Sequence, residues 1–263
     1  MKKINLMQVV PSLQSGGVEQ GTIDVANYLA ETEIKNYIAS RGGQMLSYLN
    51  KRYVEHYTMP VHSKNFLLMP FVARKMNKIV NENNVNILHI RSRAPAWLLP
   101  YINKRKLKTV STFHNVYGYN NMIKKIYTRQ LSNVDNIVAI SKYVKEEIVK
   151  NYRINQNKIS VINRGIDVNF LNADIDNQEN FIHFINKYSI NMQNKIILFP
   201  GRLTGWKGQL EFLKIAEYFK EEPIVFYFVG DDKNTSYLKK LNQEINKKNL
   251  NHNCRILGHL NKN

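Results

Sequence analysis

The most constraining feature of this 263-residue chain is the segment Phe199-Pro-Gly-Arg-Leu-Thr-Gly-Trp-Lys-Gly208, which continues the apolar run Ile196–Phe199. The pattern predicts a buried strand, then a glycine-bearing turn, then a helix that starts near Trp206. Backbone N–H groups and the helix dipole would point at whatever lies above the turn, which favours an anion. Arg202 and Lys207 bracket the turn and could neutralise a diphosphate. The alternative is an ordinary turn with two surface cations, and the glycine spacing fits neither a Walker loop nor G-x-G-x-x-G.

Short runs of β-branched residues alternate with helical patterns, which indicates parallel β–α units on doubly wound sheets. In such sheets ligands lie beyond the carboxyl ends of the strands. Gly16, Arg91, Arg93 and His114 all follow predicted strands directly, so we expect a site in the first half of the chain. Strands are predicted over residues 4–10, 37–40, 53–59, 85–90, 108–111, 137–140, 196–199, 224–229 and 255–257, and helices over 18–31, 66–84, 142–151, 181–188, 206–219 and 234–249.

Three groups of candidate residues lie at these strand ends. The Gly16-Gly17 turn lets a ligand approach the backbone closely. Taken alone the double glycine more often marks a plain tight turn, and the loop at 201–208 adds weight to a ligand site. Arg91 and Arg93 could anchor an anionic acceptor group or could simply be exposed at a helix entrance. His114, with Asn115 beside it, could contact a ligand, whereas a lone loop histidine is more often structural.

The charge of the chain is unevenly distributed. Residues 1–165 contain 25 lysines and arginines against 9 acidic residues, whereas residues 166–263 contain 13 against 11. A basic half attracts nucleic acid, an anionic membrane or a phosphorylated acceptor, unless it reflects compositional bias alone. The single cysteine, Cys254, and the lack of a signal-peptide pattern favour a cytoplasmic protein, and no apolar run is long enough to span a bilayer.

Several motifs together resemble the retaining family-4 glycosyltransferases. The segment 201–208 resembles their donor-phosphate loop, Gly16-Gly17-Val18-Glu19 matches a Gly-Gly-x-Glu turn, and Thr112-Phe113-His114 matches a Thr-x-His loop. Ala139-Ile-Ser141 and Ile159-Ser-Val-Ile-Asn-Arg-Gly-Ile-Asp167 complete the signature. The resemblance implies an α/β protein of the GT-B fold, with two Rossmann-like doubly wound domains of which the second is incomplete.

The resemblance also implies the domain limits and the roles of the candidate residues. Residues 1–167 would form the acceptor-side domain, 168–194 a boundary segment and 195–263 part of the nucleotide-sugar domain. His114, Arg202 and Lys207 would be catalytic, and Arg91, Arg93 and Asn115 would contact the acceptor. The donor would be bound by Gly16, Gly17, Gly201, Arg202, Lys207 and Gly230. The nucleotide-sugar is a substrate, and neither a metal nor another cofactor is expected, because the two cations would replace the metal.

The resemblance further implies that family members extend beyond Asn263, into a region with paired glutamates that contact the donor. We therefore expect little sugar transfer by this chain alone. One alternative is a non-catalytic remnant or subunit completed by a second polypeptide. A nucleic-acid-binding protein is disfavoured, because the basic residues form no runs with interleaved aromatics. The resemblance favours a role in lipopolysaccharide or other cell-envelope glycan synthesis, in the cytoplasm or at the inner membrane face.

Overall fold

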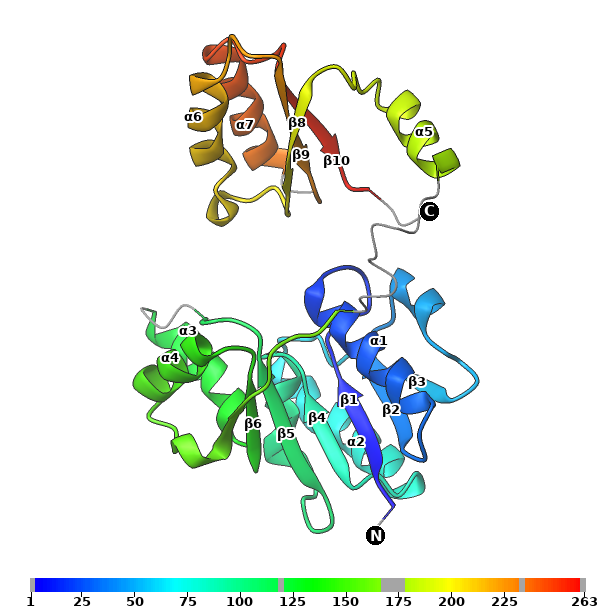
Figure 1. Ribbon diagram of the computed structural model, residues 1–263. Helices are drawn as coiled ribbons and strands as arrows, with labels where there is room; N and C mark the ends of the chain where they lie inside the picture. The colour runs from blue at the N-terminus through cyan, green and yellow to red at the C-terminus, as the bar shows by residue number, and fades with distance from the viewer. Residues whose placement is uncertain (1–2, 118–120, 167–177, 232–234, 261–263) are drawn as a thin grey trace. The chain divides into compact units, whose positions relative to one another are not determined.

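The computed structural model describes residues 3–117, 121–166, 178–231 and 235–260. The chain divides into two compact units, Met1–Asp167 and Val168–Asn263 (Figure 1). Of the predicted boundary segment, residues 168–177 lie outside the described part of the chain, and the helix predicted over 181–188 is α5, Gln178–Lys187.

The first unit contains a seven-stranded sheet in which all paired neighbours are parallel, in the order β3-β2-β1-β4-β5-β6-β7 (Figure 1). Because β1 pairs with β2 on one side and β4 on the other, the winding direction changes between β1 and β4, where α/β sheets bind ligands. The strands are β1 (Asn5–Val9), β2 (Lys35–Ser40), β3 (Val54–Thr58), β4 (Ile87–Ile90), β5 (Lys108–Phe113), β6 (Asn136–Ala139) and β7 (Ile159–Val161).

Helices cover both faces of this sheet. Ile23 and Ala26 of α1 pack with Ile38 of β2 in one apolar cluster. The neighbouring β2 residues Tyr37 and Ala39 belong to a second cluster, together with α2 and α4. Successive side chains of a strand point to opposite faces, so α1 lies on the face opposite α2 and α4. The helices are α1 (Gly17–Ala30), α2 (Met69–Glu82), α3 (Met122–Arg129) and α4 (Lys142–Tyr152).

The second unit contains a three-stranded parallel sheet in the order β10-β9-β8, with α6 and α7 packed on one face (Figure 1). Phe226 and Phe228 of β9 are fully buried against these helices. The elements are β8 (Lys195–Pro200), α6 (Gln209–Tyr218), β9 (Ile224–Val229), α7 (Thr235–Lys247) and β10 (Cys254–Gly258).

The structure corrects several local predictions. The strand at 196–199 is not buried, because Ile196 and Leu198 are 42% and 56% exposed on the face away from α6. The segment around Trp206 is a short 3₁₀ helix, Gly205–Lys207, and α6 starts only at Gln209, because Gly208 takes a left-handed conformation (φ 87°) that interrupts the helix.

Two helical segments of the first unit also differ from the sequence pattern. The helix predicted over 66–84 begins with a 3₁₀ turn, Phe66–Leu68, before α2. The pattern does not predict α3, whose apolar residues Met122, Ile123 and Ile126 face solvent rather than the core.

Candidate functional site

The residues predicted to bind ligands in the first unit gather at the carboxyl ends of β1, β4 and β5. Gly16 precedes α1 with φ 128°, a conformation that favours glycine. Gly17 begins α1, and its carbonyl oxygen accepts a hydrogen bond from the Arg164 guanidinium. The sequence places Arg164 within a family signature, but only the fold brings it to the Gly-Gly turn.

Arg91 is the most deeply buried cation of this group, with 6% of its surface exposed. Its Nη1 donates to Gln8 Oε1 at 2.9 Å, and the amide of Gln8 in turn donates to the Thr22 carbonyl of α1. Its Nε has no hydrogen-bond partner among the residues that the structure describes. Burial and then the Arg164 charge lower the pKa of Arg91 to about 10, so it remains a cation at neutral pH.

Arg93 has a different environment from Arg91. Its guanidinium lies 4.3 Å from the ring centroid of Tyr117 and 5.9 Å from that of Tyr127, which are cation–π distances. Asn115 is exposed, and its side-chain oxygen accepts from the N–H of Val116 at 2.8 Å. The charges of Arg91 and Arg164 both act on His114. Arg93 and Asn115 make the local contacts given above.

His114 follows β5, and both of its ring nitrogens are buried and lack a hydrogen-bond partner in the described part of the chain. Burial, with the charges of Arg91 and Arg164, lowers its pKa to about 3. The pKa of His89 on β4 is also lowered to about 3, mainly by burial and then by the charge of Arg91. Both rings are therefore neutral at physiological pH. Near neutrality His114 can donate or accept a hydrogen bond, but it carries no extra proton to release as a general acid.

The predicted anion loop of the second unit joins β8 to α6. The Gly201 N–H donates to Val229 O at 2.7 Å and the Leu203 N–H donates to Asp231 O at 3.0 Å, which fixes the loop to the end of β9. Arg202 and Lys207 are exposed, and the Lys207 ammonium lies 4.4 Å from the Trp206 ring centroid.

Two neighbours hold this loop in place. Gln209 is fully buried, and its side-chain amide donates to the Arg202 carbonyl at 3.0 Å. Gly230 approaches so closely that an added Cβ would lie 2.5 Å from the Gly201 carbonyl carbon and 3.0 Å from the Arg202 nitrogen. Gln209 has no sequence signal of its own, because its partner lies seven residues away across an irregular turn.

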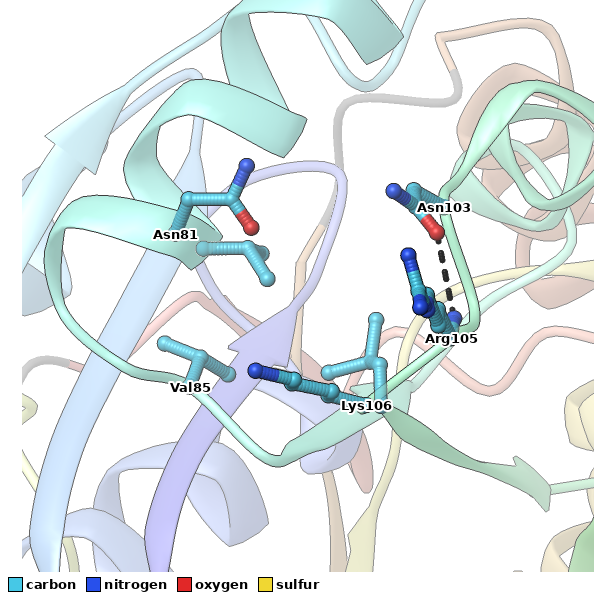
Figure 2. A pocket seen from close by; sticks show the side chains of 7 residues that line it. Asn81, Val85, Asn103, Arg105 and Lys106 are labelled. Atoms are coloured by element: carbon cyan, nitrogen blue, oxygen red, sulfur yellow. Dashed lines mark hydrogen bonds between the residues drawn. The ribbon is translucent and has the colours of Figure 1, made fainter.

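A cavity of about 220 Å³ lies at the opposite, amino ends of the central strands β4 and β5. Figure 2 shows Asn81, Asn103, Arg105 and Lys106 around it. The Arg105 N–H donates to Asn103 Oδ1 at 3.1 Å. None of the predicted site residues lines this cavity. Within the described ranges, no three His, Cys, Asp or Glu side chains come together as metal ligands.

Comparison with known proteins places this architecture. The family model described as Glycosyltransferase Family 4 matches residues 15–170, and that described as Glycosyl transferases group 1 matches residues 180–263. A crystal structure of a glycosyltransferase from Rickettsia africae ESF-5 is 34% identical, with a TM-score of 0.85, and the match covers 99% of this chain and 69% of that one.

Two more distant proteins complete the comparison. Anabaena HepE in complex with UDP-glucose is 15% identical, with a TM-score of 0.79, over 98% of this chain and 70% of its own. The phosphatidylinositol N-acetylglucosaminyltransferase GPI3 subunit of Saccharomyces cerevisiae is 26% identical over 98 residues. That match covers 35% of this chain and 22% of the yeast protein.

The two parallel sheets and the match to a solved glycosyltransferase identify the GT-B fold, and the predicted α/β fold is thereby confirmed. The chain belongs to glycosyltransferase family 4.

Proposed function

We propose that this chain carries the acceptor-side domain and part of the donor domain of a retaining glycosyltransferase. The enzyme transfers a sugar from a UDP- or GDP-sugar to an acceptor hydroxyl and keeps the anomeric configuration. Family membership supports the reaction class, and the UDP-glucose complex of HepE shows that this fold accommodates such a donor in that protein.

The observation that carries the proposal is the loop between β8 and α6. Arg202 and Lys207 are exposed on it, and neither forms an ion pair within the described part of the second unit. Gly201 has no side chain and little around it, since an added Cβ would meet only Lys207 Cδ at 3.9 Å, so a diphosphate can approach the backbone there closely. Two unpaired cations on such a loop suit two phosphate groups.

In this mechanism the protein acts chiefly through fixed charge. As the bond between the sugar and the diphosphate breaks, negative charge grows on the leaving group, and Arg202 and Lys207 stabilise it. The neutral His114 ring positions a sugar or acceptor hydroxyl by hydrogen bonding, and the two cations make a metal unnecessary.

Nucleotide binding tests this assignment. Because the chain spans 69% of the Rickettsia structure, the test uses calorimetric binding of UDP and GDP to the chain itself rather than turnover. The Arg202→Ala/Lys207→Ala variant should bind UDP and GDP about a hundredfold more weakly, since each charge-assisted hydrogen bond contributes about 1.5 kcal/mol or more.

The control variant Lys195→Ala/Lys214→Ala removes the same charge from exposed positions of the second unit and should bind normally. Uridine, which lacks phosphates, should bind all three proteins equally. Unchanged UDP and GDP affinity in the loop variant would reject the donor site.

We further propose that the acceptor is an anionic glycolipid or lipopolysaccharide precursor, met at the cytoplasmic face of the inner membrane. Besides the basic first 165 residues, α3 supports this proposal, because Ile123 and Met122 are 78% and 77% exposed beside Lys124 and Lys125. Exposed apolar side chains among lysines are typical of a helix that lies in a lipid interface. No helix within the described ranges is long and apolar enough to cross a bilayer.

Vesicle binding tests this second proposal. The chain should sediment with vesicles that contain anionic lipid, less so at high salt, and Ile123→Glu should weaken binding by tenfold or more. Tyr28→Glu makes the same charge change at an exposed residue of α1 and should bind like the wild type. Equal binding to neutral and anionic vesicles at low salt, or equal loss in both variants, would overturn the proposal.

A further inference from the structure

The first unit holds two arginines whose guanidinium groups converge beside α1. A Cβ atom placed on Gly21 would lie 3.0 Å from Arg164 Nη2 and 3.3 Å from Arg91 Nη2, so both guanidinium groups reach one point beside α1. Gly17 and Gly21 are four residues apart and therefore share a face of this helix, and neither places a side chain there. Arg164 covers Gly17 in the same way.

Three polar atoms of this cluster have no hydrogen-bond partner among the described residues. Arg91 is 6% exposed, and within the described ranges neither its Nε nor the two buried ring nitrogens of His114 have a hydrogen-bond partner. Neither arginine forms an ion pair in the described part of the chain. Of the carboxylates, Asp24 raises the pKa of Arg91, but its charge is the weakest of the influences on that group, and Asp24 accepts a hydrogen bond from Gln20.

The orientation of Arg91 is fixed before any ligand arrives. Gln8 is fully buried on β1, and the hydrogen bond from its amide to Thr22 leaves its oxygen for Arg91 Nη1. A buried cation held in this way, next to a second cation and an unpartnered imidazole, costs stability unless an anion completes it.

We propose that Arg91, Arg164 and His114 form a binding subsite for a phosphate group of the acceptor, at the carboxyl ends of β4 and β5 beside α1. Arg91 and Arg164 supply charge and hydrogen bonds to the phosphate oxygens, and His114 adds one more hydrogen bond. This inference rests on the proposed transferase function, since it names the acceptor of that reaction as phosphorylated.

Histidine-ring NMR on the 263-residue chain tests the subsite, with inorganic phosphate as the probe. The chain has seven histidines, so the His114→Asn variant identifies the His114 signal. Phosphate should shift that signal and raise the pKa of the ring, because the bound anion favours its protonated form.

Two variants and a matched control separate this site from general attraction by a basic protein. Arg164→Gln changes an exposed residue and should weaken phosphate binding at least tenfold, as expected when one charge-assisted hydrogen bond is lost. Gly21→Val fills the space between the guanidinium groups without a change of charge, and it should also weaken binding. Arg105→Gln removes an arginine beside the cavity of Figure 2, at the amino ends of the strands, and should have no effect.

The source of the phosphate is decided with two further ligands. Glycerol 3-phosphate, a lipid-headgroup monoester, should shift the His114 signal with the same dependence on Arg164, and UDP should not displace it. Displacement by UDP would assign the subsite to the donor and overturn the acceptor proposal, as would an unmoved His114 signal or equal phosphate affinity in Arg164→Gln. If phosphate shifts His114 but UDP does not bind through Arg202 and Lys207, the subsite stands and the transferase proposal fails.

Discussion

Replacement of Gly230 by alanine should destabilise the second unit strongly. A Cβ at this position would lie 2.5 Å from the Gly201 carbonyl carbon and closer still to its oxygen, and these are backbone atoms that cannot rotate away. The Gly230 N–H also donates to Gly258 O at 2.8 Å, so a shift of Gly230 disturbs β10 as well as the loop after β8. Forced overpacking of this kind costs about 2 to 3 kcal/mol.

Cys254 provides an assay confined to this unit. It is the only cysteine of the chain, it is 6% exposed on β10, and burial raises the pKa of its thiol to about 12. A thiol reagent at pH 8 therefore modifies Cys254 only when the unit opens. When reclosing is fast, the modification rate follows the opening equilibrium. A loss of about 2 to 3 kcal/mol in the free energy of opening should therefore accelerate labelling by roughly thirty- to 150-fold.

Gly201→Ala is the matched control, because its Cβ would meet only Lys207 Cδ, at 3.9 Å. It should label at nearly the wild-type rate. If Gly230→Ala and Gly201→Ala label alike, the close approach of the two strand ends does not constrain the unit and the reasoning is refuted.

Two further predictions concern the first unit. Its free energy of unfolding should fall as the pH drops from 6.5 towards 4.5, by about 1.4 kcal/mol per pH unit for each of His89 and His114. The reason is that these histidines bind protons in the unfolded chain over this range, whereas in the folded unit their pKa of about 3 keeps them neutral. Urea unfolding at several pH values checks this, and His89→Gln should roughly halve the slope; an unchanged slope would contradict the assignment. Ser141→Ala should lose about 1 kcal/mol of stability, because Ser141 Oγ caps α4 by accepting from the Val144 N–H at 3.2 Å, whereas Ser141→Gly should lose only a few tenths.

The arrangement of strands could be predicted largely from local pattern. The apolar runs at 196–199 and 224–229 predict adjacent parallel strands, and these are β8 and β9. Exposure could not be predicted in the same way, since Ile196 and Leu198 have the residue type of a core strand and yet face solvent. An apolar run of residues indicates hydrophobicity alone, whereas burial depends on whether another element covers that face of the strand.

The candidate site was predictable at its backbone turns and not in its side-chain partners. Gly16 and Gly230 follow strands and have glycine-specific roles that a pattern can indicate. The contact of Gln8 with Arg91 joins residues 83 positions apart, on strands that become neighbours only in the folded sheet. No local pattern carries that information, and the adjacent Arg91 and Arg93 look equivalent in sequence although one is buried and the other stacks on tyrosines.

The cations of the loop between β8 and α6 and those of the subsite with Arg91 are held in different ways, and this difference bears on specificity. Arg202 and Lys207 are exposed, so water screens them, and a ligand that uses them needs further contacts for affinity, as a nucleotide can provide. Arg91 is already desolvated and is oriented by Gln8, so its attraction for an anion is stronger and more dependent on position. A group that lacks a negative charge would leave that buried cation unpaired, which is the costly case. Discrimination between acceptors should therefore reside in the first unit, and a neutral acceptor analogue should be rejected there even where the donor loop is intact.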